Sequence, residues 1–229
     1  MTIMRLRITF SKTGALRYTG HLDLQKIWER TARRAGLPLA YSQGFHPLPK
    51  IQLAAALPLG FSGRAELVDI WIDDTVGAGF IPPQGDHEGR PNKEIAKLLH
   101  DAAPPGLGII KVEEVDARAS ALQTQVTSAE YEVTLLEPSD GSRLTRRLST
   151  VMEAESLPRQ RRGKAYDLRP LIEDLRLLPR SPAPLLLIRL AAREGATGRP
   201  EEVLDTLGIA FENTRIERLR LVLKSGLKS

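Results

Sequence analysis

The apolar positions near the start of the chain repeat first as in a strand and then as in a helix. Leu6, Ile8 and Phe10 alternate with polar residues, and this period of two predicts a strand with one buried face. From about residue 20 to residue 35 the apolar residues, Trp28 among them, recur every three to four positions. That spacing predicts an amphipathic helix. The chain therefore opens with a strand followed by a helix.

The first half continues as a mixed α and β pattern. Glycine and proline are frequent over residues 37–60, between the helix and the next long strand. Further segments are expected as short extended pieces near 39–42 and 50–57, a strand at 66–73, a loop at 74–91, a helix at 93–103 and a strand at 107–115. The resulting order, β-α-β-β-α-β, is that of the ferredoxin-like split βαβ unit.

The pattern restarts after a polar stretch, residues 116–128, that is typical of a linker. The second half is expected to hold a strand near 130–135, helices at 142–154 and 200–207, and strands at 185–192 and 215–223. In the last strand Leu219, Leu221 and Leu223 are expected to face inward, with Arg218 and Arg220 outward. We therefore expect an α+β protein of two tandem ferredoxin-like units, residues 1–117 and 128–229.

Composition narrows the classes of function. The 229 residues include 33 Lys and Arg against 28 Asp and Glu, a formal charge of +5. The chain has no cysteine, which excludes disulfides, thiol nucleophiles and thiolate-bound iron–sulfur clusters. No apolar run approaches the ~20 residues of a membrane span, and the first residues lack the apolar core of a signal peptide. We expect a cytoplasmic protein without a membrane partner, and no metal or cofactor bound by the chain itself.

One group of polar residues is a candidate pocket. His21 and Asp23 are expected in the first turn of the helix, and Gln43, Gly44, Phe45 and His46 in a tight turn before Pro47. If His21, His46 and Lys50 meet at one end of the sheet, two histidines and a lysine suit general acid–base cleavage of RNA. The alternative is that His21 only packs at the start of the helix and the turn has no catalytic role.

Basic residues form a second group with a possible function. Residues 143–193 hold 12 Arg or Lys against five Asp or Glu, and the run RQRRGK at 159–164 is the densest part. Such a density favours contacts with phosphates, although many charge runs are only solvated surface. The candidate RNA-binding residues are Arg30, Arg33 and Arg34 on the helix, and Arg159, Arg161, Arg162, Lys164 and Arg169 in the second half.

Aromatic residues make up only 5% of the chain, and no strand carries an alternating aromatic row. Base stacking of the kind seen in RNA recognition motifs is therefore not expected. Trp28 and Trp71 are interpreted as core residues. Tyr18, Tyr41 and Phe45 border the proline-rich segment, where they either stack on a base or pack in the core.

Several short runs resemble a known bacterial family. They comprise Phe10, Lys12, Gly14, Arg17 and residues 20–24 (GHLDL), 33–38 (RRAGLP), 41–47 (YSQGFHP) and 164–170 (KAYDLRP). On these residues the chain resembles the radical SAM-linked proteins, a family of unknown molecular function. Family members more often have serine at position 20, and Asn-Pro-His-Pro after the phenylalanine where this chain has His46, Pro47, Leu48 and Pro49. Because of these departures, the resemblance does not assign a role to a second histidine in this loop.

The resemblance implies a context and no reaction. Members of that family are fused to, or encoded beside, cobalamin-type radical SAM enzymes, which need three thiolates that this chain lacks. We therefore expect an accessory RNA-binding or adaptor protein, acting on ribosomal or transfer RNA with a radical SAM enzyme. Two alternatives remain open. One is a metal-independent endoribonuclease, because tandem ferredoxin-like units are similar to the RAMP enzymes that process CRISPR repeats. The other is a protein–protein module that docks through an apolar patch around residues 48–59.

Overall fold

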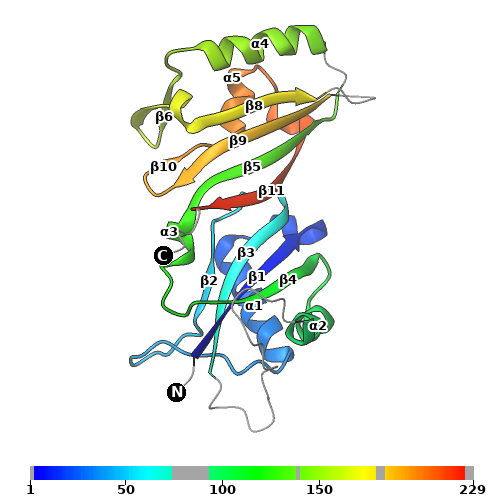
Figure 1. Ribbon diagram of the computed structural model, residues 1–229. Helices are drawn as coiled ribbons and strands as arrows, with labels where there is room; N and C mark the ends of the chain where they lie inside the picture. Colours follow the sequence, from blue (N-terminus) through cyan, green and yellow to red (C-terminus); the bar gives the residue numbers. More distant parts are fainter. Residues whose placement is uncertain (1–2, 74–92, 138–139, 179–183, 225–229) are drawn as a thin grey trace. The chain divides into compact units, whose positions relative to one another are not determined.

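A computed structural model describes residues 3–73, 93–137, 140–178 and 184–224, and the chain is an α+β protein with mostly antiparallel strands (Figure 1). It divides into two compact units, Met1–Gln125 and Val126–Ser229. From the sequence, the first unit was expected to end at residue 117 and the second to begin at residue 128, on either side of the division after Gln125. The loop expected at 74–91 lies outside the described residues.

The first unit is one antiparallel sheet covered by helices. Its strand order is β4-β1-β3-β2, and each neighbouring pair is antiparallel. Its elements are β1 (Ile3–Lys12), the 3-10 helix η1 (Gly14–Tyr18), α1 (His21–Arg34), β2 (Ile51–Leu53), β3 (Ser62–Asp73), α2 (Lys93–Ala102), β4 (Leu107–Val115) and the single turn α3 (Leu122–Gln125).

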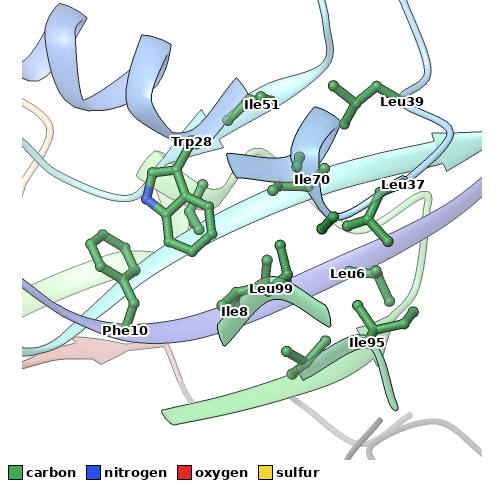
Figure 2. Packing of buried hydrophobic residues seen from close by; sticks show 14 of the residues in the cluster. Leu6, Ile8, Phe10, Trp28, Leu37, Leu39, Ile51, Ile70, Ile95 and Leu99 are labelled. Carbon is green, nitrogen blue, oxygen red and sulfur yellow. The ribbon is translucent and has the colours of Figure 1, made fainter. Parts of the chain in front are cut away.

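The apolar face of this sheet packs against α1 and α2. Leu6, Ile8 and Phe10 of β1 are fully buried, as their alternation predicts. Figure 2 shows Trp28 of α1 beside Phe10, with ring centroids 4.9 Å apart and an interplanar angle of 75°. This edge-to-face geometry suits the quadrupoles of the two rings. Ile95 and Leu99 of α2 complete the same core.

The opposite face of the sheet holds a buried charge cluster that the sequence analysis did not identify. Asp69 of β3 is fully buried and accepts hydrogen bonds from Arg5 Nε (2.8 Å) and Arg7 Nε (2.9 Å) of β1. Arg5, only 1% exposed, also donates to the carbonyls of Ala119 and Ser120 and lies 4.7 Å from the Trp71 ring centroid. Arg5 therefore ties the chain segment after β4 to the sheet.

The second unit has the strand order β11-β5-β9-β8, again antiparallel, with β10 beside the end of β9. Helix α4 lies against β8 (Figure 1). The elements are β5 (Val126–Leu135), α4 (Gly141–Glu153), β6 (Pro158–Arg161), β7 (Lys164–Asp167), η2 (Arg169–Leu171), β8 (Ile172–Leu178), β9 (Leu185–Arg193), β10 (Ala196–Thr197), α5 (Pro200–Thr206), η3 (Phe211–Asn213) and β11 (Thr214–Leu223).

The residues of β11 that face inward differ from those expected from the sequence. Arg218 is buried, with 2% exposure, while Leu219 is partly exposed. The register between β11 and β5 shifts between Arg218 and Arg220. Such a bulge inserts one unpaired residue and reverses the faces on either side of it, so simple alternation fails there. Arg220 is exposed as expected, and Leu221 is buried.

One further boundary differs from the sequence expectations. The expected linker over 116–128 ends early, because α3 and the first residues of β5 already occupy 122–128. The basic run at 159–164 lies in a β-hairpin formed by β6 and β7, which pair as a separate two-stranded sheet with Gly163 at the turn. Its strands, PRQR and KAYD, are four residues each and contain too few apolar residues to show an alternating pattern.

The longest described helix is α1, with 14 residues. None of the helices in the described segments combines the length and the apolar character that a membrane crossing requires.

Candidate nucleic-acid interface

Residues 41–49 form a hairpin that leaves the edge of the first sheet. Its base is held by backbone hydrogen bonds from the amide of Ala40 to the carbonyl of Trp71 and from the amide of Lys50 to the carbonyl of Ala40, each 2.8 Å long. Within it, the Ser42 amide donates to the Leu48 carbonyl (2.8 Å), and the Leu48 amide donates to the Ser42 hydroxyl (3.0 Å). The hairpin is therefore an ordered projection with a defined tip.

The tip carries the predicted turn residues in full contact with solvent. Gln43, Gly44, Phe45 and His46 are all exposed, and the relative exposure of Phe45 is 102%. Gly44 has φ of +127°, a conformation that residues with a Cβ rarely adopt. Phe45 thus lies on the surface, where an aromatic ring this exposed is available for a partner.

The basic side of α1 lies next to this hairpin. The Arg33 guanidinium is 5.8 Å from the centroid of the Tyr41 ring. Arg33 also donates to Glu29 over 2.9 Å, and this hydrogen bond holds the pKa of Arg33 above its ordinary value. Arg30 and Arg34 are exposed, and neither forms an ion pair with another described residue. The structure therefore brings Arg33 of α1 together with Tyr41 of the hairpin.

His21 and Asp23 lie elsewhere. Both are in the first turn of α1, next to Thr19, whose carbonyl accepts a hydrogen bond from the buried amine of Lys12 (2.9 Å). Lys12 of β1, which marks the level of the start of α1, lies opposite Gly63 of β3. Arg5 of β1 lies opposite Trp71 of β3, at the base of the hairpin. Arg5 and Lys12 are seven residues apart on β1, which is about 23 Å at 3.3 Å per residue. The start of α1 and the base of the hairpin are thus at different levels of the sheet.

The proposed acid–base set is consequently not assembled. Neither the His46 ring nor the Lys50 amine forms a hydrogen bond or ion pair with another described side chain. His21 is half-buried, and Asp23 faces solvent 3.9 Å from Lys26. Among the residues that the structure describes, no group of three or more His, Asp or Glu has a geometry that would hold a metal ion.

In the second unit, hydrogen bonds within the protein occupy all three nitrogens of the Arg161 guanidinium. Its Nε and Nη2 donate to the two carboxylate oxygens of Glu202 on α5, over 3.1 and 2.6 Å. Nη1 donates to the Thr197 carbonyl, and the guanidinium lies 4.8 Å from the Tyr166 ring centroid. Burial raises the pKa of the Tyr166 hydroxyl, which also interacts with Glu202. Arg161 therefore holds the hairpin to α5.

Arg159 and Arg169 are similarly engaged. Arg159 pairs with Asp205 of α5 at 3.1 Å. Arg169 donates to the carbonyls of Met152 (2.7 Å) and Ile172 (3.1 Å), joining the end of α4 to the start of β8. These two arginines and Arg161 link segments of the second unit. The sequence could not show this, since the acidic partners of Arg159 and Arg161 lie about forty residues away on α5.

Arg162 and Lys164 are the exposed cations of the run. Arg162 (φ +49°) and Gly163 (φ +78°) form the two-residue turn between β6 and β7, a geometry that requires positive φ at both positions. Neither Arg162 nor Lys164 has an ion-pair partner among the described residues.

Residues 164–170, the last of the runs that carry the family resemblance, have a structural role. Asp167 accepts hydrogen bonds from the backbone amides of Leu157 (2.7 Å) and Arg169 (2.9 Å), and the bond from Leu157 is the main cause of its lowered pKa. Leu168 is fully buried. The motif therefore closes the turn that joins the hairpin to the body of the unit.

Comparison with known sequences adds one finding. A search of the curated proteins finds no match to the chain. Residues 5–200, most of the chain and parts of both units, match a family described as "Uncharacterized protein conserved in bacteria (DUF2344)". The family description gives no activity. The chain therefore belongs to this bacterial protein family.

Proposed function

We propose that the protein is an accessory RNA-binding protein. Its binding surface is formed by Arg30, Arg33 and Arg34 of α1 with Tyr41, Phe45 and His46 of the hairpin, and is called the α1–hairpin surface below. The observation that carries this proposal is the contact of Arg33 with Tyr41, which places one exposed cation of α1 against the hairpin that carries a fully exposed phenylalanine.

The chemistry of this surface suits single-stranded RNA. Arginines neutralise phosphates, and an exposed aromatic ring stacks on an unpaired base with little regard to its identity. Unpaired bases are also the usual target of proteins that bind RNA outside helices. The exposed Arg162 and Lys164 of the second unit are candidates for additional phosphate contacts, whereas Arg159, Arg161 and Arg169 are engaged internally.

Fluorescence anisotropy with a labelled single-stranded RNA tests the proposal. Phe45→Ala should weaken binding by the ~1–3 kcal/mol of one stacked base, about 5- to 150-fold. Arg30→Ala with Arg34→Ala should lower the slope of log affinity against log salt by about 1.4, since each phosphate contact on a single strand contributes about 0.7. The matched control, Arg162→Ala with Lys164→Ala, removes the same charge from the second unit and should have a smaller effect.

Two outcomes contradict the proposal. Absence of binding at low salt rejects an RNA-binding function, and a larger loss in the control variant rejects the α1–hairpin surface as the main site. Gel analysis of the same RNA, incubated with EDTA, examines the endoribonuclease alternative. Cleavage that disappears in His21→Ala would favour that enzyme over a binding protein.

A second candidate, a protein-binding adaptor, is favoured by the exposed leucines. Leu48 is 68% exposed and Leu59 is 61% exposed. Leucine side chains do not stack on bases, and a contiguous exposed apolar patch is typical of a protein interface. From the resemblance alone we propose a radical SAM enzyme as the partner. In calorimetric titration with such an enzyme, Leu48→Ala, which changes no charge, should weaken binding about tenfold while RNA affinity is unchanged; equal affinity for the enzyme contradicts the adaptor function.

We also propose that both units are ferredoxin-like. In support, the first unit has the order β4-β1-β3-β2 with α1 and α2 on one core, and the second has the corresponding order β11-β5-β9-β8.

A further inference from the structure

The second unit contains a pocket to which the proposed RNA binding assigns no role. The pocket has a volume of about 380 Å³ and lies between the first turns of α4 and the segment that joins α5 to β11. We propose that it binds a small ligand in which an oxyanion, a carboxylate or a phosphate, is attached to an apolar group. The proposal does not depend on RNA binding.

The apolar part of the pocket is made by leucines of three elements. Leu135 ends β5, Leu144 lies in α4 and Leu207 follows α5, and all three are buried. Ligand pockets typically combine such an apolar lining with a few fixed polar groups, and volumes from about 300 Å³ upward accommodate small molecules. These leucines therefore suit a ring or a short aliphatic group.

Arg147 is the fixed polar group. Its Nη1 donates to the Leu207 carbonyl over 2.6 Å, which holds the guanidinium at the wall. Gly208 makes this position possible, because a Cβ there would lie 2.6 Å from Nη1, and its φ of +65° also favours glycine. A guanidinium held in this way keeps further N–H groups for an oxyanion, which arginine binds in a planar, bidentate geometry.

Two more donors line the pocket, and neither donates a side-chain hydrogen bond to another described residue. They are the exposed guanidinium of Arg143, one helical turn before Arg147, and the side-chain amide of Asn213. Residues four apart lie on the same helical face, so the two arginines can address one ligand.

Acidic groups limit the charge of the ligand. Glu137 and Asp140 also line the pocket. The Asp140 carboxylate accepts hydrogen bonds from the Ser142 hydroxyl and from the amides of Ser142 and Arg143, which keep its pKa low and the group ionised. Two carboxylates thus balance the two arginines. A ligand with a single oxyanion group and an apolar remainder fits this balance better than a polyanion.

Saturation-transfer NMR on the full-length chain tests the proposal with three probes. Benzoate presents a carboxylate, phenyl phosphate presents a phosphate, and benzyl alcohol presents the ring alone. We expect saturable binding of at least one of the two anions, with benzyl alcohol at least about tenfold weaker. The anion that binds more tightly shows whether the pocket prefers a carboxylate or a phosphate.

Variants locate the binding. Arg147→Ala and Gly208→Ala, which displaces the Arg147 guanidinium, should each weaken binding at least about tenfold. The matched control, Arg146→Ala, removes a neighbouring exposed arginine of α4 that does not line the pocket and should bind as the wild type does. Circular dichroism confirms that each variant is folded, and Gly208→Ala retains the arginine itself. No saturable binding of either anion up to about 10 mM, or equal affinity in all three variants, overturns the proposal.

Discussion

Replacing Asp69 by asparagine should destabilise the first unit strongly. The substitution keeps the size of the side chain but removes the charge that faces Arg5 and Arg7 on the neighbouring strand. Arg5 is buried and cannot recover water, whereas Arg7 is 13% exposed and partly can. Removing one partner of a buried ion pair typically costs about 3–5 kcal/mol. Because Arg5 keeps its bonds to two carbonyls, we expect the lower end, about 3 kcal/mol.

Urea unfolding followed by tryptophan fluorescence measures this loss. Both tryptophans, Trp28 and Trp71, belong to the first unit, so excitation at about 295 nm reports on that unit alone. With a slope near 2 kcal/mol per molar urea, a loss of 3 kcal/mol lowers the midpoint by about 1.5 M. Glu29→Gln is the matched control, because it removes the same charge from the exposed Arg33 pair and should cost about 0.3–0.5 kcal/mol.

A double-mutant cycle separates the pair from the rest of the cluster. If the cost of Asp69→Asn arises from leaving Arg5 buried and uncompensated, Arg5→Met with Asp69→Asn should be clearly more stable than the sum of the two single losses predicts. Additive losses, or a loss from Asp69→Asn no larger than that of Glu29→Gln, would refute the reasoning.

Three further predictions concern the second unit. Glu202→Gln removes the charge that holds Arg161. Trypsin should then cleave after Arg162 about fivefold faster for each 1 kcal/mol by which the attachment of the hairpin to α5 is weakened. An unchanged cleavage rate would show that the ion pair does not hold the hairpin. Gly163→Val forces a branched side chain into φ of +78° and should speed the same cleavage, whereas Gly141→Ala, whose added carbon meets no neighbour, should not. The hydrogen bond from Arg220 lowers the pKa of Glu130 below its ordinary 4.5, so its contribution to stability is present above that pH and is lost as the pH falls through the lowered pKa. Glu130→Gln should therefore lose less thermal stability than the wild type between about pH 5 and pH 2, and parallel losses in circular-dichroism melts would contradict this.

The long elements of the first unit follow from periodicity because each of them faces one core. The alternation of Leu6, Ile8 and Phe10 and the helical spacing around Trp28 place the buried residues correctly. Lys12 continues the same alternation but is not apolar, and its burial depends on contacts such as the one with the Thr19 carbonyl. A polar residue in an apolar pattern gives no sign of such a partner, so its burial could not be predicted.

The candidate site was harder to predict, for a different reason. Exposure of Phe45 and the meeting of Arg33 with Tyr41 depend on the path of a nine-residue hairpin, which local patterns do not determine. Likewise, a count of basic residues treats Arg161 and Arg162 alike, although one is fixed to Glu202 and the other faces solvent. Charge density along a sequence therefore indicates where cations are, but not which of them remain available for a ligand.

The hairpin at residues 41–49 also affects how the first sheet resists self-association. An edge strand with free amides and carbonyls is a template for pairing with another chain. Here β2 is only three residues long, and the segments around it contain Pro47, Pro49 and Pro58, which cannot donate to a neighbouring strand. The detour of the chain through the hairpin thus keeps this edge short and interrupted. The same segment that presents Phe45 to solvent protects the sheet beneath it from aggregation.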